Sequence, residues 1–168
     1  MELVVNHCTV TPVRQEPSER SEQLTQLLFG EVCEVLDRLP RWTKIRSTVD
    51  RQEGWVDFKM LTYVSNEAME VKGDEAVRYV AVPMAVVTEM ETGAELMLTL
   101  GTRLPNYTHG IFEVLDKKYL IDPACVNCLE ARGETVCALA QSLLNTPYLW
   151  GGKNAMGMDC SGFTQVVY

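Results

Sequence analysis

Cys160 is the residue whose type and position point most directly to chemistry. It follows a glycine-punctuated loop and precedes an apolar run from Phe163 to Tyr168. If that run is helical, Cys160 lies at a helix N-terminus, where unpaired N–H groups and the helix dipole favour a thiolate. Asp159 is a good N-cap residue, and Gly162 permits a close backbone approach. Because a thiolate is the working nucleophile of covalent catalysis, the pattern predicts a catalytic cysteine.

The alternative interpretation of Cys160 is a small buried core residue. The surrounding sequence favours catalysis. Residues 146–152 read Thr-Pro-Tyr-Leu-Trp-Gly-Gly, and residues 159–162 read Asp-Cys-Ser-Gly. The two motifs, at this separation, resemble the NlpC/p60 family of cysteine peptidases, whose nucleophile lies in an Asp-Cys-Ser-Gly tetrapeptide. The resemblance implies that Cys160 is the nucleophile.

The same resemblance implies a substrate and roles for neighbouring residues. Asp159 and Ser161 match positions that help to hold the free amino group of a terminal L-Ala, and a carboxylate beside an ammonium suits that role. Trp150 matches an aromatic wall of the substrate cleft. The implied reaction is hydrolysis of short murein peptides between γ-D-Glu and the diamino acid, with no metal and no other cofactor. The preferred diamino acid is left open.

A catalytic cysteine also needs a general base, normally a histidine oriented by a third polar group. The sequence has two histidines, His7 and His109, and both precede Cys160. In the family the base lies downstream of the nucleophile, so neither matches, and both are expected in surface or loop positions. The expectation is an N-terminal fragment that is inactive alone. Its apolar end, from Phe163 to Tyr168, favours self-association.

The elements ahead of this segment are mostly β. Gly54-Trp55-Val56 and a polar stretch from Arg14 to Glu22 resemble features of a bacterial SH3-like domain over residues 1–64, expected to be a small barrel. Trp42 and Trp55 are interpreted as barrel core or rim rather than ligand contacts. The candidate strands are Leu3 to Val5, Glu31 to Leu36, Trp42 to Arg46 and Gly54 to Phe58.

Residues 65–128 are also β-rich and resemble, more weakly, a second, diverged SH3-like module. The alternative is an elaboration packed on the first barrel. The β-rich stretches are Arg78 to Glu89, Ala94 to Leu100, Ile111 to Leu115 and Lys118 to Ile121.

The hydrophobic period changes in the last part of the chain. Helical spacing relates five apolar positions, which are Val136, Leu139, Ala140, Leu143 and Leu144. Residues 129–168 are therefore expected to form the N-terminal part of an NlpC-type domain. The expected fold is mainly β, with SH3-like barrel modules followed by the helical opening of an α+β papain-like domain.

The charge, the hydropathy and the cysteine spacing of the chain argue against several classes of partner. The net charge of −8 and the lack of any basic run argue against nucleic acid. No apolar run reaches the roughly 20 residues of a membrane span, and the first residues do not form a signal peptide, so a cytoplasmic location is expected. Cys33 and Cys137 are interpreted as small core residues. Cys125 and Cys128 form a C-x-x-C without a second pair, which argues against zinc.

Two other functions are compatible with this organisation. The SH3-like modules could bind cell-wall peptide or a protein partner without catalysis, or a separate chain could supply the rest of the catalytic domain. The Asp-Cys-Ser-Gly motif favours the enzyme, because a binding module does not need a poised thiol.

Overall fold

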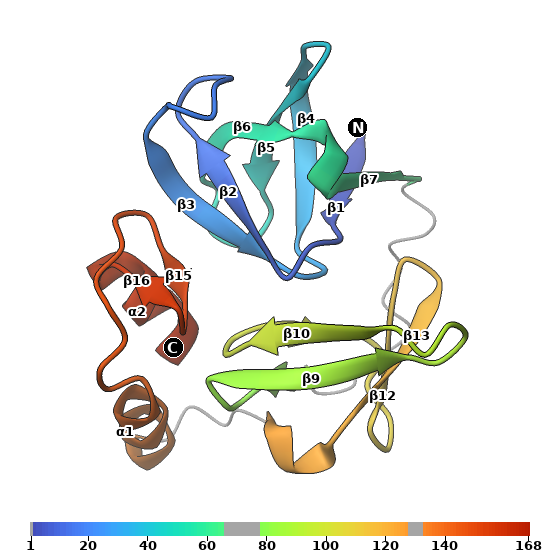
Figure 1. The fold of residues 1–168 in the computed structure, drawn as a ribbon, viewed down its shortest axis with the longest axis vertical. Helices are drawn as coiled ribbons and strands as arrows, with labels where there is room; N and C mark the ends of the chain where they lie inside the picture. The colour runs from blue at the N-terminus through green and yellow to red at the C-terminus, as the bar shows by residue number, and fades with distance from the viewer. Residues whose placement is uncertain (1, 66–77, 128–132) are drawn as a thin grey trace.

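The computed structural model describes residues 2–65, 78–127 and 133–168. The N-terminal part is an antiparallel sheet of seven strands in the order β3-β2-β6-β5-β4-β1-β7 (Figure 1). Its elements are β1 Leu3–Asn6, β2 Val10–Arg14, β3 Gln23–Leu28, β4 Val32–Arg38, β5 Trp42–Ser47, β6 Glu53–Asp57, the 3-10 helix η1 Phe58–Met60 and β7 Leu61–Val64. The four candidate strands of this region are confirmed.

This sheet wraps around its own small core, as an SH3-like fold does. The end strands β3 and β7 are not paired with each other among the described residues, so the barrel is not closed by hydrogen bonds. Trp42 is 8% exposed and belongs to the core, as expected. The core cluster consists of Val4, Val13, Leu27, Cys33, Ile45, Val56 and Leu61.

The second β-rich region forms two small sheets, in the orders β10-β9-β13-β12 and β11-β8-β14. Its elements are β8 Arg78–Val80, β9 Met84–Glu89, β10 Glu95–Thr99, β11 Arg103–Leu104, β12 Ile111–Val114, β13 Lys117–Ile121, the 3-10 helix η3 Pro123–Cys125 and β14 Val126–Asn127. The β-rich stretch from Arg78 to Glu89 forms two strands, β8 and β9. The stretch is interrupted before Met84, where Pro83 cannot donate a ladder hydrogen bond. That this region is a diverged SH3-like module stays a prediction.

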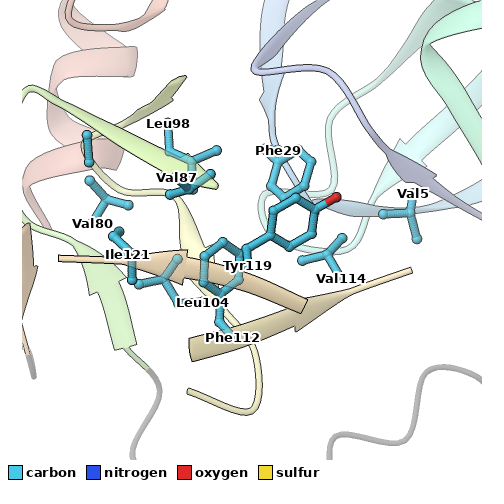
Figure 2. Close-up of a cluster of buried hydrophobic side chains, with 11 residues drawn as sticks. Val5, Phe29, Val80, Val87, Leu98, Leu104, Phe112, Val114, Tyr119 and Ile121 are labelled. Carbon is cyan, nitrogen blue, oxygen red and sulfur yellow. The ribbon is translucent and has the colours of Figure 1, made fainter. Parts of the chain in front are cut away.

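The two β regions share one hydrophobic cluster (Figure 2). The Tyr119 ring stacks on Phe112 with ring centroids 5.3 Å apart, and it meets Phe29, from the turn after β3, edge to face at 5.3 Å. Val5 of β1 joins the same cluster. The second region therefore packs directly on the first.

The C-terminal part is built from two helices and a short hairpin beside β3 (Figure 1). It contains α1 Gly133–Ser142, β15 Lys153–Asn154, β16 Gly157–Met158 and α2 Cys160–Val167. One cluster joins α1 and α2 to Leu100 of the second region. Its buried members are Leu100, Leu139, Leu143, Met158, Val166 and Val167.

Two expectations for the first helix are wrong. Leu144 is 72% exposed, because α1 ends at Ser142 and Leu144 lies beyond its apolar face. Cys137 is exposed rather than a core residue. It lies two positions before the buried Leu139, which is about 200° around a helix and hence on the opposite side.

Candidate active site around Cys160

Cys160 is the first residue of α2, and it is exposed. The preceding residue, Asp159, has the extended backbone of an N-cap, with φ −98° and ψ −176°. Its carboxylate accepts a hydrogen bond of 2.8 Å from the N–H of Gly162. The helix and its cap are therefore as expected from the sequence, and the thiol lies where a helix leaves its first N–H groups unpaired.

The Asp159 carboxylate links the loop before α2 to the first turn of that helix. Oδ1 accepts from the Ser161 hydroxyl at 2.7 Å as well as from Gly162, and Oδ2 accepts from the Gly151 N–H at 2.9 Å. Burial raises the pKa of this carboxyl, but these hydrogen bonds outweigh burial and hold the pKa below its ordinary value. The Asp159 side chain is thus an ionised carboxylate that connects the loop to the helix. Asp159 is only 9% exposed.

Two glycines of the motifs are needed because backbones meet here. Gly151 has φ +67°, and a Cβ at this position would lie 2.5 Å from the carbonyl oxygen of Gln23. A Cβ on Gly162 would collide with the carbonyl oxygen of Gly152. Gly162 thus lets the Asp-Cys-Ser-Gly motif approach the backbone of the Gly-Gly motif, and Gly151 lets the loop approach β3.

Trp150 lies at the contact between this segment and the N-terminal sheet. Its indole Nε1 donates a hydrogen bond of 2.9 Å to Glu22, and its carbonyl oxygen accepts one of 3.1 Å from Gln23 Nε2. The side chain is 61% exposed, so much of its surface is free to meet solvent. Cys160 and Ser161 are the first two residues of α2 and directly follow its N-cap, Asp159. Trp150 precedes Gly151, whose N–H donates to the Asp159 carboxylate. Their roles toward substrate stay predictions.

Sequence reasoning missed a buried polar contact next to this loop. The Lys153 ammonium lies 2.9 Å from a Glu31 carboxylate oxygen, and the two side chains are 4% and 12% exposed. Gln26 Oε1 accepts hydrogen bonds of 2.8 Å from the Lys153 N–H and from Asn154 Nδ2. No local signal marks these residues, because charged and amide side chains normally predict surface positions.

Burial raises the pKa of the Glu31 carboxyl, while the neighbouring Lys153 ammonium opposes that rise. The second carboxylate oxygen, Oε2, is buried without a hydrogen-bond partner among the described residues. The Lys153 ammonium therefore offsets the cost of burying the Glu31 carboxylate.

Neither histidine forms a described hydrogen bond with Cys160. His7 Nδ1 lies 2.9 Å from the Thr62 hydroxyl in an exposed contact, and His109 is an exposed residue with φ +49°. Both therefore occupy surface positions, as expected. Within residues 2–65, 78–127 and 133–168, no group of three His, Cys, Asp or Glu side chains could hold a metal ion. Cys128 of the C-x-x-C lies outside the described residues.

A cavity of about 380 Å³ lies elsewhere, between the N-terminal sheet and the second region. Tyr63, Arg103 and Asp116 are among its lining residues, and none of Trp150, Asp159, Cys160 or Ser161 reaches it. Among the described helices, none has the length and apolar character that crossing a membrane requires.

Comparisons with known proteins agree with this architecture. The γ-D-glutamyl-L-lysine dipeptidyl-peptidase of Bacillus cereus is 28% identical over 165 residues, which cover 86% of this chain and 49% of that protein. The protein of the same name from Bacillus subtilis is 26% identical over 158 residues, covering 86% of this chain and 52% of the relative. The chain thus spans about half the length of these relatives.

Solved structures show the same fold. The crystal structure of an NlpC/P60 family protein from Bacillus cereus superposes with a TM-score of 0.80 at 20% identity, covering 99% of this chain and 71% of the other. Residues 9–62 match the family of bacterial SH3 domains, and residues 145–168 match the NlpC/P60 family. Residues 9–62 of this chain are therefore similar to bacterial SH3 domains, and the segment that contains Cys160 is similar to the NlpC/P60 family.

Proposed function

We propose that this chain is the nucleophile-bearing part of a cysteine peptidase that acts on cell-wall peptides. The observation that carries the proposal is the Asp-Cys-Ser-Gly motif, folded as an exposed thiol on the first residue of a helix that its own aspartate caps. A structural cysteine has no need of this exposure, and a thiol at a helix N-terminus suits nucleophilic catalysis. The names of the two Bacillus relatives support the peptidase class.

The proposed substrate is a short murein peptide with a free N-terminal L-Ala, cut between γ-D-Glu and the diamino acid. Cys160 Sγ attacks the carbonyl carbon of that amide, and the C–N bond breaks as a general acid protonates the leaving amine. Water then hydrolyses the thioester, which releases the acyl peptide and restores the thiol. Asp159 and Ser161 are proposed to face the ammonium of L-Ala, and Trp150 to form a wall of the cleft.

The reaction also needs a base for the thiol, and no histidine among the described residues is hydrogen-bonded to Cys160. We therefore propose that the 168 residues alone do not turn over substrate.

The test compares the complete product of the gene that encodes these residues with the 168-residue chain. Each is incubated with L-Ala-γ-D-Glu-L-Lys, and release of L-Lys is followed by mass spectrometry. We expect cleavage by the complete product, none after Cys160→Ser, and cleavage retained after Cys137→Ser, which changes another exposed cysteine.

Cleavage that survives Cys160→Ser would overturn the assignment of the nucleophile. Peptide binding without cleavage by the complete product would instead favour a non-catalytic SH3 module. Turnover by the 168-residue chain alone would refute its proposed inactivity.

A further inference from the structure

The loop that precedes the Cys160 helix is held by side chains of the bacterial SH3 domain. Gln26, on the edge strand β3, accepts hydrogen bonds of 2.8 Å from both Lys153 N–H and Asn154 Nδ2. Glu31, in the turn that follows β3, pairs with the Lys153 ammonium at 2.9 Å. Two neighbouring residues of β15 are therefore fixed by two side chains from another part of the fold.

These contacts are buried, so water cannot easily replace them. Gln26 is 7% exposed, Lys153 is 3% exposed and Asn154 is 6% exposed. An acceptor lost in such a place leaves its donors without a partner, which costs more than the hydrogen bond itself contributes. Within the part of the chain that the structure describes, Gln26 is thus the shared acceptor of two buried donors.

The held loop leads directly to the cap of α2. The carbonyl oxygen of Gly152, the residue before β15, accepts from the Asp159 N–H at 3.1 Å. The Gly151 N–H donates to Asp159 Oδ2 at 2.9 Å. The strand β15 also pairs with β16, with Lys153 opposite Met158. A shift of β15 would therefore move both the backbone and the side chain of the residue that caps the Cys160 helix.

We propose that Gln26 and Glu31 of the SH3 domain are positioning residues for Cys160, acting through the loop of residues 151–154. Gln26 sets the position of β15 along the β3 edge, and the buried Glu31–Lys153 pair fixes its distance from the sheet. The inference rests on the proposed function only in taking Cys160 as the reacting thiol. It assigns the SH3 domain a mechanical role in the peptidase site.

The first test is hydrogen exchange of the 168-residue chain. Gln26→Met keeps the length of the side chain and removes the acceptor. We expect amides of residues 159–163 to exchange about three- to tenfold faster, the range that corresponds to the net loss of one hydrogen bond. Amides of β4 to β6, in the SH3 sheet, keep their exchange rates.

Two variants at neighbouring or identical positions serve as controls. Thr25→Val changes a buried residue of the same strand that has no described hydrogen bond to residues 150–154, and it should leave the exchange of residues 159–163 unchanged. Gln26→Glu retains an acceptor and should restore most of the protection. Unchanged exchange at residues 159–163 in Gln26→Met would overturn the proposal, as would an equal effect of Thr25→Val.

The second test uses the complete gene product and the peptide L-Ala-γ-D-Glu-L-Lys. A displaced nucleophile lowers kcat by about tenfold in Gln26→Met. Because Asp159 and Ser161 move with the helix, KM rises as well, and the loss of kcat is the readout of positioning. A change in KM alone would contradict a positioning role. If no variant cleaves the peptide, the proposed function fails, while the exchange experiment still decides whether Gln26 positions the helix.

Discussion

Asp159 connects two segments through one carboxylate. It caps α2 through Gly162, and it also accepts from Gly151 in the preceding loop. Replacing Asp159 by Ala removes both contacts. We expect the free energy of unfolding to fall by about 1–2 kcal/mol, the usual cost of a lost cap. Chemical denaturation measures this, with Glu95→Ala as a control at an exposed carboxylate of β10. Equal losses in the two variants would argue against the cap.

The same carboxylate predicts a pH dependence. Its hydrogen bonds hold the folded-state pKa below the ordinary 3.8, so the unfolded chain takes up the proton first as the pH falls. The stabilisation by Asp159 is therefore complete above the ordinary pKa and is lost as the pH falls through the lower, folded-state value. We expect the stability difference between the parent and Asp159→Ala to shrink in that acidic range. A difference that stays constant down to full protonation would contradict this.

Gly151 gives a prediction that separates backbone strain from collision. It has φ +67°, and an added Cβ would meet the carbonyl of Gln23, whereas Gly93 has φ +72° with nothing within 4 Å of an added Cβ. Gly93→Ala should cost about 1–2 kcal/mol from the left-handed backbone alone. Gly151→Ala should cost clearly more, because it also displaces the loop from β3. Thermal unfolding of both variants makes the comparison, and equal losses would count against the close approach.

The residues that act locally could be predicted from the sequence, and those that act at long range could not. The Asp159 cap and the start of α2 follow from a short motif and its apolar continuation. Gln26 and Lys153 are separated by 127 positions, and nothing in either neighbourhood indicates that they meet. Cys137 was assigned to the core from its apolar neighbours, but the orientation of α1 decides its exposure.

Among the strands too, those with a strong local signal could be predicted and those that depend on distant contacts could not. Strands with strong β-branched and aromatic character, such as β5, were predicted within a residue or two of their ends. The sequence does not predict β2 or β3, because β2 contains Pro12 and β3 contains two glutamines. These two strands are recognised only by their pairing with each other. Pairing with other strands therefore decides whether a segment of weak β propensity forms a strand.

The ion pair between β15 and the turn after β3 predicts an asymmetric mutational response. Lys153→Met leaves the Glu31 carboxylate buried without its counter-charge, and we expect a loss of about 3–5 kcal/mol. The double variant Lys153→Met with Glu31→Leu removes both charges and should recover most of that loss. Denaturant unfolding of the two variants measures the difference. A double variant as unstable as Lys153→Met would show that desolvation of Glu31 is not the cause.

The molecule as a whole is joined by the aromatic contact of Phe29 with Tyr119. Because Phe29 comes from the N-terminal region and Tyr119 from the second, loss of either should weaken both regions together. Phe29→Ala is expected to cost about 3–5 kcal/mol. Exchange protection should fall in β9 and β13 as well as in the first sheet. Phe58→Ala, at a residue 41% exposed, is the control. Loss confined to the first sheet would contradict a shared core.

The strand β3 ends its sheet, and residues 151–154 lie against that end. A sheet edge with free N–H and C=O groups is a template on which another chain can add a strand. The loop that leads to Cys160 therefore also shields the edge of the N-terminal sheet from edge-to-edge aggregation. A domain excised after Val64 would lose this cover, and its solubility would depend on what replaces the loop at β3.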